Sequence, residues 1–153
     1  MKALLLALLC TVAPADAPRL TFAGFGALRI GMSADALARI AEVRRADLEQ
    51  EGRWPCRYIL FDGATVGVRI GAAGVVAIEI ADPRHRTLSG IGVGSSIDDV
   101  RAVYRRRASM EEARFVVRSQ DRTRALVIET DGRVVTRLVA GAVRVVERAA
   151  PCL

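Results

Sequence analysis

The strongest constraint on the fold is a short segment that occurs twice, in the same order and without a gap. Residues 26–40 align with residues 89–103 at an offset of 63. The aligned pairs include Gly31 and Gly94, Ser33 and Ser96, Asp35 and Asp98, Leu37 and Val100, and Ile40 and Val103. Each copy has an apolar side that must be buried, and the other copy offers the surface to bury it. The sequence therefore predicts a single domain of two repeats, at about 20–82 and 83–153.

Each copy predicts an amphipathic helix that begins directly after a serine. Apolar residues recur at helical spacing at Leu37, Ile40 and Ala41 in the first copy, and at Ile97, Val100, Val103 and Tyr104 in the second. Ser33 and Ser96 suit the N-cap, where a side-chain oxygen accepts a hydrogen bond from the first turn. Asp99 follows Ser96 by three residues and completes a capping-box pattern.

Strand-like apolar runs follow each helix. They are Cys56–Phe61, Val66–Ile70 and Val75–Ile80 in the first copy, and Phe115–Arg118, Ala125–Glu129 and Val134–Ala140 in the second. The last two runs of each copy predict a hairpin, and these hairpins align at an offset of 58. Thr130-Asp131-Gly132 indicates a tight turn, because glycine accepts a positive φ without steric cost.

A last apolar run, Val143–Glu147, predicts an edge strand. Together these segments predict an α+β fold: an antiparallel sheet with two helices on one side, built from two helix-then-strands repeats.

The first 15 residues have the order of a secretory signal. Lys2 precedes an apolar run from Ala3 to Val12, and the small residues of Ala13-Pro14-Ala15 follow. An apolar run of about ten residues is too short for a helix that spans a bilayer. We therefore expect cleavage near Ala15, a periplasmic or secreted protein, and no transmembrane segment in the mature chain.

Removal of the signal leaves two cysteines, Cys56 and Cys152. An oxidising compartment permits disulfides, so this pair predicts one bridge between an early strand and the C-terminus. Two cysteines and one distant histidine do not make a zinc site, and we expect neither a metal nor a cofactor. The alternative of a lipoprotein would use Cys10, but Leu8 and Leu9 precede it where such a signal has small residues.

The basic side chains are almost all arginine. Lys2 is the only lysine among the 23 basic residues, and the net charge is +6. A candidate basic patch lies on and after the second helix, at Arg101, Arg105, Arg106 and Arg107, with Arg44 and Arg45 on the first helix. Such a patch fits an acidic protein or a lipid phosphate, and the alternative is a solvated helix end. Nucleic acid is not expected as a partner outside the cytosol.

No residue pattern predicts catalysis. His85 is the only histidine, and it lies in a basic linker where no spacing places it beside a nucleophile. The glycines of Gly90-Ile-Gly-Val-Gly94 match neither the dinucleotide nor the P-loop pattern, and Asp98 in the next helix would repel a phosphate. We therefore expect a protein that binds rather than an enzyme.

The two units, the Gly31-Met32-Ser33 helix start and the export signal resemble two families of small exported bacterial proteins. One contains the tandem-repeat β-lactamase inhibitory protein, and the other contains the small lipoproteins of outer-membrane assembly. The second half, with Gly90-Ile-Gly-Val-Gly-Ser-Ser96 and Glu129-Thr-Asp-Gly132, looks most like uncharacterised exported proteobacterial proteins.

Both named families act by binding other proteins. The resemblance therefore implies a non-catalytic, envelope-associated or protein-binding module, whose exposed sheet face would meet a periplasmic or envelope protein. The alternative is binding of an anionic envelope ligand, a lipid or polysaccharide, through the arginine patch.

Overall fold

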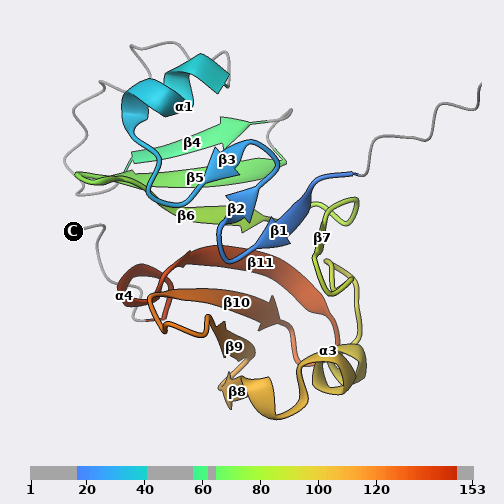
Figure 1. Ribbon diagram of the computed structural model, residues 1–153. Helices are drawn as coiled ribbons and strands as arrows, with labels where there is room; N and C mark the ends of the chain where they lie inside the picture. Colours follow the sequence, from blue (N-terminus) through green and yellow to red (C-terminus); the bar gives the residue numbers. More distant parts are fainter. Residues whose placement is uncertain (1–16, 41–56, 62–64, 148–153) are drawn as a thin grey trace, which may run out of the picture.

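A seven-stranded antiparallel sheet is the central element of the fold (Figure 1), seen here in a computed structural model that describes residues 17–40, 57–61 and 65–147. Its strands are, in spatial order, β4 (Arg57–Phe61), β5 (Val66–Gly71), β6 (Gly74–Ile80), β11 (Val135–Ala142), β10 (Arg124–Thr130), β9 (Arg114–Arg118) and β8 (Ala108–Glu111). Strands β6 and β11 come from different halves of the chain and pair with each other, Ile80 opposite Leu138. This pair makes one continuous sheet from the two halves.

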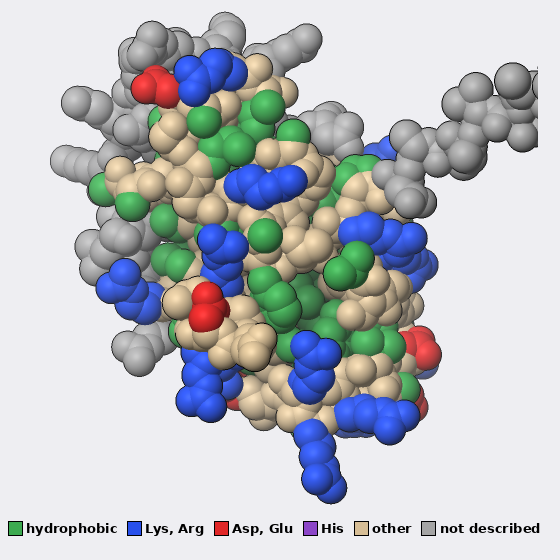
Figure 2. Space-filling view, viewed as in Figure 1, with side chains coloured by type: hydrophobic (Ala, Val, Ile, Leu, Met, Phe, Trp, Pro, Cys, Tyr) green, Lys and Arg blue, Asp and Glu red, His purple; other side chains and the backbone are tan. Residues whose placement is uncertain are grey.

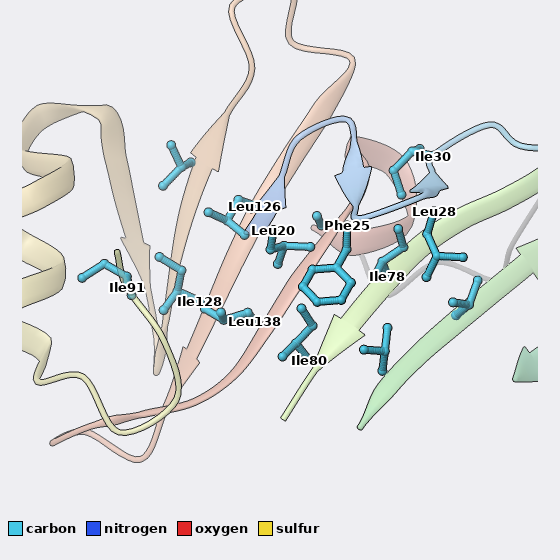
Figure 3. Close-up of a cluster of buried hydrophobic side chains, with 14 of the residues drawn as sticks. Leu20, Phe25, Leu28, Ile30, Ile78, Ile80, Ile91, Leu126, Ile128 and Leu138 are labelled. Atoms are coloured by element: carbon cyan, nitrogen blue, oxygen red, sulfur yellow. The ribbon is translucent and has the colours of Figure 1, made fainter. Parts of the chain in front are cut away.

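A second sheet of four short strands lies across the first (Figure 1). Its order is β3 (Leu28–Arg29), β2 (Gly24–Phe25), β1 (Arg19–Thr21) and β7 (Arg86–Thr87). Strands β1 and β7 are parallel, so this small sheet also joins segments from the two halves. Leu20, Phe25 and Leu28 of the small sheet point into the buried cluster (Figure 3).

The predicted α+β arrangement is wrong, because the chain is mostly β with two sheets. The helices of the described residues are short: α1 (Ala34–Ile40), α3 (Ile97–Tyr104) and α4 (Val143–Val146), with one 3₁₀ turn, η1 (Arg105–Arg107). The prediction failed because the strands of the small sheet have only two or three residues. Alternation of apolar and polar residues needs about four residues to be visible in a sequence.

The predicted edge strand at Val143–Glu147 is also wrong, since Val143–Val146 forms helix α4. Its valines favour a strand locally. However, Val145 and Val146 are adjacent in the sequence, and both are buried in the same cluster with side chains of the large sheet. A strand would place these two side chains on opposite faces, so burial of both on one surface favours the helical turn.

Side chains alternate along the large sheet and form one buried cluster on each face. Leu126, Ile128 and Leu138 belong to the larger cluster, which also includes residues of the small sheet, α1 and α3 (Figure 3). On the opposite face the buried residues are Val76, Ala77, Val116, Ala125, Val127 and Val139, packed with Val145 and Val146 of α4. Much of the sheet is therefore covered on both faces.

The segments that lead into α1 and α3 are each bound to the hairpin of their own half by two equivalent backbone hydrogen bonds. Gly31 N–H donates to Val75 O at 2.7 Å, and Val75 N–H donates to Met32 O at 2.8 Å. In the second half, Gly94 N–H donates to Val135 O at 2.8 Å, and Val135 N–H donates to Ser95 O at 2.9 Å. We call these two pairs of bonds the helix clamps.

The helix clamps match Val75 with Val135, an offset of 60 rather than the 58 obtained from apolar residues alone. A shift of two residues along a strand keeps every side chain on the same face. The apolar pattern therefore fits equally well at both offsets, and only the hydrogen bonds distinguish them.

Helix α3 begins with a complete capping box. Ser96 Oγ accepts a hydrogen bond from Asp99 N–H at 3.1 Å, and Asp99 Oδ2 accepts one from Ser96 N–H at 3.2 Å. At the start of α1, Ser33 Oγ accepts from Ala36 N–H at 3.2 Å.

Ser96→Ala is expected to lower the free energy of unfolding by about 1 kcal/mol, because one backbone donor of α3 loses its acceptor. Urea denaturation monitored by circular dichroism measures this change. Ser89→Ala, at an exposed serine of the same loop, is the control and should change stability by less than about 0.5 kcal/mol. Equal effects at the two serines would contradict the role of the cap.

Candidate functional site

Three consecutive exposed arginines, Arg105, Arg106 and Arg107, follow α3. Arg105 Nε donates to Ala102 O at 3.3 Å. Within residues 17–40, 57–61 and 65–147, no carboxylate forms an ion pair with any of the three guanidinium groups. By contrast, Arg101 Nη1 lies 3.3 Å from Asp98 Oδ1. The candidate patch thus consists of one paired and three unpaired arginines.

The end of α3 is fixed to the small sheet beneath it. Tyr104 is buried, and its hydroxyl donates to Thr87 Oγ1 at 3.2 Å. Thr87 is also buried, and its Oγ1 accepts from Ile91 N–H at 3.1 Å. The next residue, Arg105, ends the helix abruptly with φ 45° and ψ −122°. The hydrogen bonds of Tyr104 and Thr87 therefore fix the residue directly before the three arginines.

Two exposed apolar side chains accompany the arginines. Val103 of α3 is 42% exposed and Met110 of β8 is 60% exposed. Arg101 Nη2 lies 3.9 Å from Met110 Sδ, so the helix and the strand are in contact. We call the surface of α3, η1 and β8 the α3–β8 corner, and Figure 2 shows basic side chains around this end of the molecule.

A pocket of about 390 Å³ opens beside this corner. Ile97, Met110 and Phe115 are its apolar lining, while Arg101, Glu112, Arg114 and Asp131 are the charged residues around it. The backbone N–H groups of Val134 and Arg133 hold the pKa of Asp131 below its ordinary value, so this carboxylate stays charged. Two cations and two anions give the pocket no preference for one sign of ligand charge.

A second pocket, of about 420 Å³, lies between the turn of β1 and β2 and the turn of β9 and β10. Asp121 lines it, and its pKa is lowered to about 2 because the Ser119 hydroxyl and Thr123 N–H donate to its carboxylate. Both hydrogen bonds lie within the turn between β9 and β10, so the carboxylate of Asp121 has a structural role there.

The remaining candidate residues have structural roles or lie elsewhere. His85 is half-buried, and the centre of its ring lies 4.9 Å from the centre of the Phe25 ring. Ser95 Oγ accepts a hydrogen bond from Gly92 N–H at 3.1 Å. Cys56 and Cys152 are outside the described residues, as are Arg44 and Arg45, so the disulfide stays a prediction.

The described part of the chain has neither a cluster of metal ligands nor a membrane-spanning helix. No three His, Cys, Asp or Glu residues are grouped so that they would hold a metal ion. No helix there has both the length and the apolar character needed to cross a membrane.

Sequence reasoning missed the row of ion pairs on the face of the large sheet that α4 covers. Arg69 Nε lies 2.7 Å from Glu79 Oε1, Arg137 Nη1 lies 3.8 Å from Glu79 Oε2, and Arg137 Nε lies 3.4 Å from Glu129 Oε2. These residues are cross-strand neighbours on β5, β6, β11 and β10. Only the strand register, which no local pattern gives, brings them together.

No protein-family model and no curated protein matches the chain. Among solved structures, the chain is similar to the uncharacterised protein YfeY from Escherichia coli, with a TM-score of 0.37 and 9% sequence identity. The match covers 56% of this chain and 72% of that chain. A similarity of this size transfers neither a fold nor a function.

Proposed function

We propose that this chain is an exported, non-catalytic binding module that contacts an acidic surface of another periplasmic or envelope protein through the α3–β8 corner. The observation that carries the proposal is the run of three arginines that pair with no carboxylate of the described residues, with Val103 exposed on the preceding helix and Met110 exposed on the following strand. Export rests on the signal predicted at residues 1–15.

The chemistry of the corner fits a protein interface. A guanidinium group binds a carboxylate through two parallel hydrogen bonds, and no carboxylate of the described residues pairs with Arg105, Arg106 or Arg107. Val103 and Met110 supply apolar area that is exposed to water in the free protein. Arginine and methionine are both enriched in protein interfaces relative to the rest of a surface.

The corner is a better candidate than the face of the large sheet. One face of that sheet is buried against the small sheet, α1 and α3, and the other is buried in part against α4. Arg137 and Glu129, which are partly exposed on the second face, form an ion pair with each other. Paired charges of this kind offer little to a partner, so we place the contact surface at the α3–β8 corner instead.

An anionic lipid or polysaccharide would also bind three free arginines. However, phosphate and carboxylate groups alone gain nothing from Val103 and Met110, because these side chains carry no charge or donor. A polysaccharide offers these side chains no apolar contact, whereas a protein surface or the acyl chains of a phospholipid would contact them. The lipid arm of the experiment distinguishes a protein partner from a phospholipid.

Charge reversal at Arg105, Arg106 and Arg107 to glutamate is expected to abolish recovery of the partner. Immobilised protein, purified after export of the full chain, would be incubated with an envelope extract, and bound proteins would be identified by mass spectrometry. The partner should be retained by the wild type and lost with the triple variant. Raising the salt to about 1 M, where the Debye length is about 3 Å, should weaken but not abolish retention.

The matched control reverses three other exposed arginines, Arg19, Arg122 and Arg144, which makes the same change in net charge. This control should retain the partner. Equal recovery by the Arg105–Arg107 variant would contradict the proposal, and so would the absence of any specific partner. Binding to vesicles of anionic phospholipid that is lost at high salt, without a protein partner, would support the lipid alternative.

A further inference from the structure

Strand β8 is the last strand of the large sheet, and no described strand pairs with its outer edge (Figure 1). The two-residue turn at Glu112 and Ala113 closes on the pair of Glu111 with Arg114. In such a hairpin the closing pair is hydrogen-bonded, and the hydrogen-bonded residues then alternate along the strand. The N–H and C=O groups of Ala108 and Met110 therefore point to the open edge.

The charges around β8 are arranged symmetrically about its centre. The sequence from residue 105 to 112 is Arg-Arg-Arg-Ala-Ser-Met-Glu-Glu, with basic residues before the strand and acidic residues at its end. An identical strand running antiparallel beside it would bring the basic end of each copy to the acidic end of the other. The segment is therefore complementary in charge to itself.

Symmetry restricts how two copies of β8 can pair. Residues directly opposite each other in a sheet have side chains on the same face, and along one strand only every second residue shares a face. Two identical antiparallel strands can therefore pair only about a two-fold axis at which one residue lies opposite its own copy. An axis at Ser109 places Ala108 opposite Met110 of the second copy, so that all four outward-facing residues form hydrogen-bonded pairs. The same axis places Arg107, the residue directly before the strand, opposite Glu111, the last residue of the strand.

We propose that β8 pairs with β8 of a second copy of this chain, antiparallel about Ser109, and joins two large sheets edge to edge. The Arg107 side chain of each copy then lies beside Glu111 of the other. Opposite charges at cross-strand positions stabilise a pair of strands, and like charges destabilise it. Parallel pairing of the two strands would set arginine beside arginine and is excluded by the same rule.

The exposed features of β8 agree with this pairing. Among the features by which natural edge strands avoid association, β8 is short, but it has no proline and keeps a regular register with β9. Met110 is 60% exposed, and the side chain of Glu111 is 42% exposed although it lies 3.3 Å from Arg114 and 3.9 Å from Arg118. Arg107 forms no ion pair within the described residues.

The inference goes beyond the proposed function and does not depend on it. It uses the edge of β8 with Arg107 and Met110, which also belong to the α3–β8 corner, and it leaves Arg101, Val103, Arg105 and Arg106 available to another protein. Because β8 has only four residues, the interface is small and the association is expected to be weak.

The test mixes two charge-reversal variants, Arg107→Glu and Glu111→Arg. Sedimentation velocity of the wild type should show a mass that rises towards that of a dimer with concentration, whereas each variant alone should associate about tenfold more weakly. In a dimer of either variant alone, both of the cross-strand charge pairs related by the two-fold axis consist of like charges. In an equimolar mixture, the heterodimer sets opposite charges at both positions, and association should return to that of the wild type.

A second pair of variants tests the backbone without changing any charge. Met110→Pro removes an N–H that points to the open edge, so it should prevent dimers while leaving the thermal unfolding close to that of the wild type. Met110→Ala keeps the N–H and should still dimerise. Both variants keep every arginine, so a loss of the dimer in Met110→Pro alone is not caused by a change in charge.

Three outcomes would overturn the inference. The first is a monomer mass for the wild type at about 1 mM, the weak end of the affinity scale. The second is unchanged dimerisation in Arg107→Glu. The third is a mixture of the two charge variants that stays monomeric while the wild type dimerises. If Met110→Pro fails to fold, the mixing experiment alone decides.

Discussion

Gly74→Ala is expected to lower the free energy of unfolding by about 3–5 kcal/mol, which is exceptional for the addition of one methyl group. Gly74 has φ +106°, a region that costs other residues about 1–2 kcal/mol. A Cβ at this position would lie 2.2 Å from Met32 O, which is a backbone atom. Met32 O accepts the hydrogen bond of one helix clamp, so relief of the clash would also disturb the start of α1.

Gly132→Ala is the matched control for this prediction. Gly132 has φ +91°, close to that of Gly74, but a Cβ there would meet no atom within 4 Å. Its cost should therefore be the conformational part alone, about 1–2 kcal/mol. Chemical denaturation of both variants gives the difference between them. Equal losses would show that the close approach of Met32 to Gly74 does not exist in solution.

Leu138→Ala should cost about 2–5 kcal/mol, the range for removal of a fully buried leucine side chain. Leu138 has no exposed surface, and its strand β11 is the one that pairs with β6 of the other half. Its side chain lies in the larger cluster near Ile128 and Ile80 (Figure 3). The substitution leaves a cavity at the point where the two halves meet.

The control is Leu88→Ala, because Leu88 is 74% exposed and its truncation should change stability by less than about 0.5 kcal/mol. Differential scanning calorimetry measures both variants. A single transition that shifts to lower temperature in Leu138→Ala is expected if the halves unfold together. Two separate transitions, with only one of them shifted, would contradict a shared core at Leu138.

The elements predicted best from the sequence are those with a repeated apolar pattern. Helix α3 begins directly after Ser96, and β5, β6, β9 and β10 lie at or within one or two residues of the predicted runs. In these segments the alternation of residues and the caps agree with the tertiary environment. Where the two disagree, as at Val143–Val146, burial of adjacent valines determined the structure.

The fold class could not be predicted because the small sheet leaves almost no local signal. Its strands have two or three residues, and Leu20, Phe25 and Leu28 are each separated from the next by turn residues. Their strand character comes from pairing with one another and from burial against the large sheet. Both are properties of the assembled fold rather than of any short window.

The candidate site was predicted in part. A count of charges finds Arg101 and Arg105–Arg107, but it does not separate the arginine that has a carboxylate partner from the three that do not. Nor does the sequence show that Met110 is exposed, since an apolar residue in a strand is more often buried. Position at the edge of the sheet decides both its exposure and its contact with α3.

The two helix clamps have a consequence for how the molecule deforms. Each clamp fastens a helix to the hairpin of its own half, so the geometry within a half is set locally. Within the large sheet, the halves share only the ladder of β6 with β11, which has four residue pairs. A bend between the halves would therefore strain this ladder and the β1–β7 pair of the small sheet, which also joins the halves, while leaving both helix clamps unchanged.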